Sequence, residues 1–199
     1  MSRVKKAYYQ NSASTSDGAL DMEFEPKTYM QRIAPPPVVL VSTLHGDIKN
    51  VAPFGMIMPI SSDPPLLVLG VSEKRDTFKN IQETGEFVVG VASPDLVQQI
   101  ETAAESFPRD VSEFDEAGLT PVQSRIVKPF RIGECQTNFE CKLEWMHEAG
   151  DHYVVVGRIV AADVRDDVHR TGTRADIKPV YYVVRHRYAT QGSTINLSE

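Results

Sequence analysis

Short apolar runs, each bounded by turn-forming residues, recur along the sequence from residue 38 onward. Runs that are rich in Val, Ile, Leu and Phe and end at Pro, Gly, Asn or Asp are typical of β-strands. The runs expected to be strands are residues 38–43, 50–60, 66–72, 87–92, 135–147, 152–164 and 180–185. The two longest face each other across a turn at residues 148–151, which predicts a β-hairpin.

Helices are expected at residues 76–84, from residue 93 onward, and at residues 112–117. The first is predicted to begin at a cap formed by Asp76 or Thr77 and to end at Gly85. The second opens with Ser93 as the cap and Pro94 at the first helical position. Strands in succession, interrupted by short helices, predict a mainly β protein: an antiparallel barrel with peripheral helices packed outside it.

The two ends of the chain differ in composition from the part between them. Residues 1–20 are rich in Ser, Thr, Asn and Gly, which is typical of a mobile arm, and residues 191–199 form a polar tail. Residues 21–190 are expected to form a single domain, since 199 residues suit one domain of ordinary size.

Composition and charge exclude several kinds of partner. A net charge of −6 argues against a nucleic-acid surface, which is normally basic. No apolar run approaches the roughly 18 residues that span a bilayer, and the N-terminal segment lacks the apolar core of a secretory signal. We therefore expect no nucleic-acid or membrane partner, and a cytoplasmic location.

The two cysteines, Cys135 and Cys141, lie in or beside a segment of alternating polarity, QTNFECKLEW. Its odd positions are mostly apolar and its even positions, among them Asn138 and Glu140, are polar, which predicts a strand with one face in water. Both cysteines fall on the dry side and are expected to be inert core thiols. Neither the cysteines nor the histidines have the spacing of a metal site, so no metal is expected.

A concentration of positive charge marks the segment SEKRDTFKNI, residues 72–81. Lys74 and Arg75 follow an apolar run, and a predicted helix begins directly behind them. The unpaired amides at a helix N-terminus suit a phosphate, and Thr77, Arg75 and Asn80 would add side-chain donors. The alternative is a capped surface helix with solvated cations, and the segment alone favours that alternative.

A second segment, LVSTLHGDIKNVAPFGM, offers a place for a flat ligand. Ser42 and Thr43 end one strand, and Asn50 enters the next, followed by Val51, Ala52 and Pro53. A small residue next to a proline leaves a strand backbone approachable and partly unpaired. An ordinary hairpin with an edge proline would give the same pattern.

The chain resembles the flavin reductase-like family of FMN-binding split barrels, which includes flavoredoxins and the small reductase partners of two-component monooxygenases. The resemblance covers roughly residues 30–188 and rests on an ordered set of segments. These are VSTLHGDIKNVAPF, SSDPP, KRDTFKNIQETGEFVV, SFPRDVSEFDEAGLTPVQS, VKPFRIGE, FECKLEW and GDHYVVVGRIV.

The resemblance implies FMN, bound non-covalently at the interface of a homodimer. It implies that the phosphate lies at Arg75, Thr77 and Asn80 with Ser42 or Ser72 nearby, and that the isoalloxazine lies against residues 50–53. The residues expected to bind the cofactor are Ser42, Thr43, Asn50, Val51, Ala52, Pro53, Ser72, Arg75, Asp76, Thr77 and Asn80.

Three departures from the family pattern concern the reducing partner and substrate rather than FMN. Ala34 precedes the proline run where the family often has arginine, and Gly55 replaces the usual serine after Ala-Pro-Phe. Near the C-terminus, Arg185-His186-Arg187 stands where a glycine pair is expected.

His152 matches a family position near the flavin face, where it could orient nicotinamide or substrate as a catalytic residue; a hairpin-end histidine bonded to a neighbour is the alternative. The histidines at positions 45, 147, 169 and 186 are expected at the surface. Glu113 and Glu116, with Asp115 between them, are interpreted as a solvated helix face.

Three functions follow. The first is an oxidoreductase that takes hydride from NADH or NADPH onto FMN and passes electrons to free flavin, a partner protein or a small acceptor. The second is an FMN electron carrier without a nicotinamide site. The third is a split barrel for another ligand, such as pyridoxal phosphate or haem, but no residue can be assigned to hold either.

Overall fold

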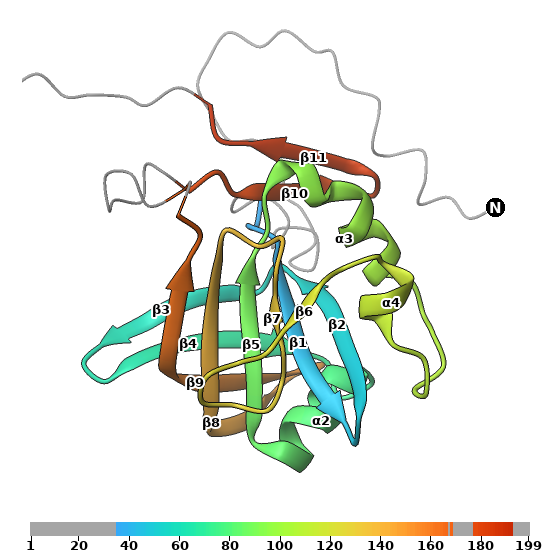
Figure 1. The fold of residues 1–199 in the computed structure, drawn as a ribbon. Helices are drawn as coiled ribbons and strands as arrows, with labels where there is room; N and C mark the ends of the chain where they lie inside the picture. Colours follow the sequence, from blue (N-terminus) through green and yellow to red (C-terminus); the bar gives the residue numbers. More distant parts are fainter. Residues whose placement is uncertain (1–34, 167, 169–176, 193–199) are drawn as a thin grey trace, which may run out of the picture. The chain divides into compact units, whose positions relative to one another are not determined.

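The computed structural model describes residues 35–166, 168 and 177–192, and its main element is a seven-stranded antiparallel sheet (Figure 1). The predicted arm at residues 1–20 and residues 193–199 of the predicted tail lie outside the described residues. The strands of the sheet are β1 (Val39–His45), β2 (Ile48–Phe54), β3 (Ile57–Ser62), β4 (Pro65–Val71), β5 (Glu86–Val91), β8 (Thr137–Ala149) and β9 (His152–Val164). Their order in the sheet is β2-β1-β5-β8-β9-β4-β3.

Helices and two small hairpins surround this sheet (Figure 1). The helices are α2 (Asp76–Thr84), a short 3₁₀ turn η3 (Pro94–Leu96), α3 (Val97–Ala103) and α4 (Glu113–Glu116). The hairpins pair β6 (Pro121–Val122) with β7 (Arg131–Ile132), and β10 (Val180–Val184) with β11 (Arg187–Thr190). The predicted class, a mainly β split barrel with peripheral helices, is confirmed.

The sheet is buried on both faces along β1, which explains the continuous apolar run in its sequence. Val41 faces one core, where it packs with Phe87 of β5 and Val155 of β9. Leu40 faces a second core, which contains Ile100 of α3 and Phe114 of α4. Helix α2 completes the first core, and α3 and α4 cover β2 on the other side.

The run at residues 50–60 is not one strand, as predicted, but two. The chain leaves β2 at Phe54 and enters β3 at Ile57, and these consecutive strands lie at opposite edges of the sheet. Met56, in the link, accepts a backbone hydrogen bond from Gly70 of β4 at 2.8 Å. The link therefore crosses from one edge of the sheet to the other, a step that strand periodicity does not reveal.

The predicted wet face of β8 is wrong at Asn138 and Glu140, which are buried, and right farther along the strand, where Lys142 and Glu144 are exposed. The Glu140 carboxylate accepts backbone N–H bonds from Arg125, Ile126 and Val127, at 2.9, 2.7 and 3.3 Å. A loop thus covers this face and supplies its hydrogen-bond partners from the backbone. Cys135 and Cys141 are buried, as expected, and burial raises the pKa of both thiols well above the ordinary range.

The bounds of α2 match the prediction, and Gly85 ends it with φ of 69°, a conformation that glycine tolerates best. The predicted cap is wrong: the N-cap residue is Arg75, and no side chain caps the helix. Residues 187–190, for which no strand was predicted, form β11 and pair with β10.

Candidate functional site

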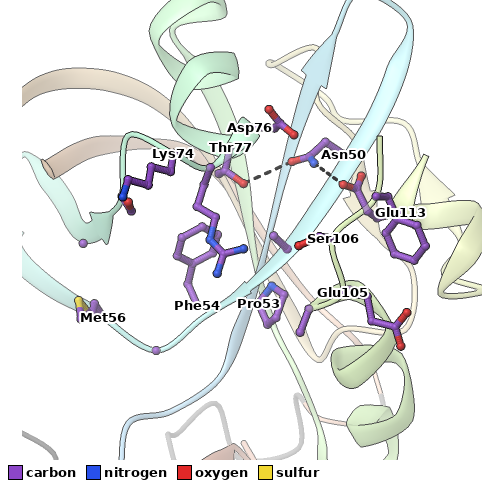
Figure 2. Close-up of a pocket in the computed structure, with 18 of the residues that line it drawn as sticks. Asn50, Pro53, Phe54, Met56, Lys74, Asp76, Thr77, Glu105, Ser106 and Glu113 are labelled. Carbon is purple, nitrogen blue, oxygen red and sulfur yellow. Dashed lines mark hydrogen bonds between the residues drawn. The ribbon is translucent and has the colours of Figure 1, made fainter. Parts of the chain in front are cut away.

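A cavity of about 410 Å³ opens where the link from β2 to β3 meets the turn from β4 to α2 (Figure 2). The segment after α3 and the start of α4 close its other side. Its lining is Asn50, Ala52, Pro53, Phe54, Gly55, Met56, Gly70, Ser72, Lys74, Arg75, Asp76, Thr77, residues 103–107, Glu113 and His152. The two segments that the sequence marked, residues 40–56 and 72–81, therefore meet at one cavity.

One wall of the cavity is cationic. Lys74 and Arg75 line it directly before α2, whose first-turn amides have no side-chain cap. The one carboxylate of this turn, Asp76, lies 3.1 Å from Lys79 Nζ and 3.8 Å from Arg109 Nε. Because these neighbours offset the Asp76 charge, the wall keeps a positive character that suits an anion.

A buried hydrogen-bond network lies beside the cavity, with Asn50 at its centre. Asn50 Oδ1 accepts from the hydroxyls of Thr43 at 2.9 Å and Thr77 at 3.3 Å. Asn50 Nδ2 donates to Glu113 Oε1 at 2.9 Å (Figure 2). Asn80 extends the network by donating to Thr43 at 3.0 Å. The network fixes α2, β1, β2 and α4 relative to one another around the cavity.

Eight of the residues expected in the site line the cavity: Asn50, Ala52, Pro53, Ser72, Arg75, Asp76, Thr77 and His152. Four others, Ser42, Thr43, Val51 and Asn80, are completely buried behind it. Asn80 has both ends of its amide engaged, because Oδ1 accepts from Arg109 at 2.9 Å. The structure therefore gives Thr43 and Asn80 a supporting place in the network, one layer behind the lining.

Glu113 is the main correction to the sequence interpretation. It is not on a solvated face: 9% of its surface is exposed, and it lines the cavity. Burial raises the pKa of its carboxyl, and the hydrogen bond from Asn50 offsets this effect only in part. A sequence signal was present, because Glu113 stands four residues before the buried Ala117 and so shares its face of the helix. Glu116 is exposed, as expected.

The other lining residues that the sequence analysis missed come from the link at residues 54–56, from Gly70 and from residues 103–107. Lys74, which the sequence marked for its charge without assigning it to the cofactor, lines the cavity as well. Residues 103–107 carry no motif of their own. They reach the cavity because α3 packs against β2.

His152 is bonded to a neighbour at the hairpin end, as one of its two sequence interpretations expected. It begins β9, with Nδ1 2.8 Å from Asp151 Oδ1, and it also lines the cavity. The hydrogen bond from His152 lowers the pKa of the Asp151 carboxyl. His147 and His186 are exposed and His45 is partly exposed, whereas His169 lies outside the described residues.

Within the described ranges, no cluster of three or more His, Cys, Asp and Glu side chains is arranged to hold a metal ion. The helices of the same ranges are all too short or too polar to cross a membrane.

The structure is a split barrel in which a cationic helix start and the backbone of β2 line one cavity. The chain belongs to the flavin reductase-like family, whose domain model matches residues 30–191.

Individual relatives agree with this assignment. An uncharacterized protein of Aquifex aeolicus is 36% identical over 148 residues, 71% of this chain and 76% of the relative. The reductase subunit HsaB of a flavin-dependent monooxygenase from Rhodococcus jostii is 25% identical over 160 residues, 78% of this chain and 79% of HsaB.

Two solved structures have the same fold. Nitrilotriacetate monooxygenase component B from Bacillus cereus aligns with a TM-score of 0.79 and 27% identity, over 94% of this chain and all of the other. Flavoredoxin of Desulfovibrio vulgaris aligns with a TM-score of 0.74 over 94% of this chain and 97% of the other. Its 23% identity shows the fold alone.

Proposed function

We propose that this protein is an FMN-dependent oxidoreductase that takes hydride from NADH or NADPH and passes electrons to free flavin, a partner protein or a small acceptor. The observation that carries the proposal is the meeting of the cationic turn at Lys74 and Arg75 with the backbone of residues 50–53 in one cavity. The family suggests an oxidoreductase, and the names of HsaB and of component B describe components of monooxygenase systems.

The lining fits a flavin phosphate at one end. Arg75 offers a bidentate fork and Lys74 a point charge, while the first amides of α2 face the same wall. Ser72 adds a hydroxyl from the end of β4. A cavity of about 410 Å³ also lies within the usual range of about 300–1,000 Å³ for small-molecule sites.

The lining fits a flat ring at the other end. Ala52 and Gly55 are small, and Pro53 has no N–H, so the β2 edge offers backbone acceptors without a bulky side chain in front of them. Phe54 and Met56 add apolar surface beside this edge. Of the predicted ring contacts, Asn50, Ala52 and Pro53 are in position to meet a ligand directly.

When bound, FMN supplies the hydride chemistry, and the protein supplies binding, orientation and exclusion of water. Arg75, Lys74 and Ser72 would hold the phosphate. Residues 50–53 would hold the ring. His152, at the rim with its Nδ1 engaged by Asp151, would position the nicotinamide.

The test is FMN binding followed by reduction. Purified protein supplied with FMN should show a bound-flavin absorption spectrum, and anaerobic mixing with NADH or NADPH should bleach it. His152→Ala should retain FMN affinity and slow the bleaching. Protein that cannot take up FMN would end the proposal. FMN uptake without bleaching by either nicotinamide would favour the electron-carrier alternative, which has the flavoredoxin fold as its precedent.

A further inference from the structure

Glu113 has a feature that the proposed function does not use. Its Oε1 accepts from Asn50 at 2.9 Å, but its Oε2 is buried and has no hydrogen-bond partner among the residues that the structure describes. Of the described residues that line the cavity, Glu113 alone has such an atom. A buried carboxylate oxygen without a partner is costly, and an arrangement of this kind calls for an explanation.

A neutral carboxyl removes most of that cost. Because Oε1 already accepts a hydrogen bond, the proton of a neutral Glu113 resides on Oε2. Burial favours this form and raises the pKa of the carboxyl, and the nearby Asp76 charge acts in the same direction. The Asn50 amide and nearby backbone N–H groups oppose the shift without reversing it.

Charged groups near Glu113 come from several elements. Lys74, Arg75, Asp76, Glu105 and His152 line the same cavity, and Asp115 and Glu116 lie on α4 itself. The elements packed against α4 also carry Lys49 of β2, which lies 5.9 Å from the centre of the Phe130 ring, and Glu101 of α3, which pairs with Tyr188 and His186. Neither Lys74 nor Arg75 makes an ion pair with Glu113. No described cation is therefore placed to stabilise an ionised Glu113 directly.

We propose that Glu113 must be neutral for flavin to occupy the cavity, so that flavin binding takes up one proton from solvent at this residue wherever the free protein has it ionised. This inference rests on the proposed flavin site. Glu113 lines the cavity, so a flavin there would exclude water from the space beside its carboxyl. An ionised carboxylate then loses the solvation that this nearby water provides, whereas a neutral carboxyl loses little.

The coupling between flavin binding and protonation of Glu113 has a definite sign. Flavin affinity is highest at low pH, where Glu113 is neutral in the free protein, and falls as the pH rises through its elevated pKa. Above that pKa, the dissociation constant rises about tenfold per pH unit, the limit for uptake of a single proton. Riboflavin shares this dependence because the ring covers the cavity with or without a phosphate.

The experiment is a fluorescence titration of full-length protein with riboflavin from pH 5 to 9. Calorimetry in two buffers of different ionisation enthalpy then counts the protons taken up. Wild-type protein should show the slope and an uptake approaching one proton per flavin. Glu113→Gln keeps the shape and presents an amide donor where the protonated acid does, so it should bind with the low-pH affinity at every pH and take up no proton. Glu116→Gln, on the exposed face of the same helix, should behave as wild type.

Riboflavin is the primary probe because the FMN phosphate itself titrates near pH 6. A Glu113→Gln variant with the wild-type slope, or wild-type protein without slope or proton uptake, would overturn the inference. Proton uptake by wild-type protein is measured without the variant, so the proposal can be contradicted even if Glu113→Gln does not fold. Absence of flavin binding at every pH would instead contradict the proposed function, and with it this inference.

Discussion

At the scale of single residues, the site depends on the two ends of the Asn50 amide. Its oxygen accepts from the hydroxyls of Thr43 and Thr77, and its nitrogen donates to Glu113. An aspartate at this position would lack the donor and place a second carboxylate against Glu113. Because of this network, Thr77→Ala would not report on the phosphate alone. That substitution removes a hydrogen bond to Asn50 as well as any bond to a ligand.

Arg75 is therefore the better probe of the phosphate. Arg75→Ala removes a charge-assisted fork, and hydrogen bonds to charged groups are worth about 1.5–3 kcal/mol, so FMN should bind roughly ten- to hundredfold more weakly. Riboflavin, which has no phosphate, should bind almost as it does to wild type. Lys142→Ala, which removes an exposed charge from β8, is the control. The measurement is a fluorescence titration with both flavins, and equal losses for the two would place the phosphate elsewhere.

At the scale of elements, the burial of Glu140 shows how β8 holds the loop that covers it. Burial by itself would raise the pKa of this carboxyl, but three backbone N–H bonds and the nearby Arg131 hold the pKa below its usual value. A group with a lowered pKa stabilises the fold above its ordinary titration range, and the stabilisation is lost as the pH falls through the lower, folded-state value.

Glu140→Gln should lower the free energy of unfolding by about 3 kcal/mol at pH 7, because the new amide turns a donor toward the backbone N–H groups. Thermal unfolding followed by circular dichroism measures this loss, which should shrink as the pH falls below about 4. Glu144→Gln, farther along β8, is the control, because its pair with Arg158 is exposed and of little consequence for stability. Equal melting temperatures for wild type and Glu140→Gln would contradict this account of the loop.

At the scale of the whole molecule, β3 is an edge strand with apolar side chains open to solvent. Met58 and Ile60 of β3 are 58 and 41% exposed, and Met56, in the link before it, is 49% exposed. An apolar sheet edge of this kind favours association, and closed two-fold dimers are the commonest solution. We expect a homodimer that covers this edge beside the cavity, to which Met56 contributes.

Light scattering should give twice the chain mass of 22.2 kDa. Met58→Asp should shift the protein toward the monomer, whereas the same kind of change on an exposed face of β8, Lys142→Asp, should not. A monomeric protein that retains full FMN affinity would show that a second copy is not needed to form the site.

Local patterns determined most of the strands. The apolar runs that became β1, β4, β5, β8 and β9 are continuous or alternating in sequence, and Gly85 ends α2 as its conformation requires. The cationic turn at Lys74 and Arg75 was visible for the same reason, because a strand end and a helix start are local features. The pairing of that turn with residues 50–53 came from the family resemblance and not from periodicity.

Tertiary structure alone decided which polar side chains are buried and which reach the cavity. Glu113, Asn138 and Glu140 stand at polar positions of the sequence, and they are buried because distant segments provide hydrogen-bond partners there. The division of residues 50–60 into β2 and β3 likewise depends on the order of strands in the sheet, which places these two consecutive strands at opposite edges. Hydrogen bonds to buried polar groups depend on long-range contacts, whereas strand and helix patterns are local, and for this reason most strands could be predicted and the buried polar residues could not.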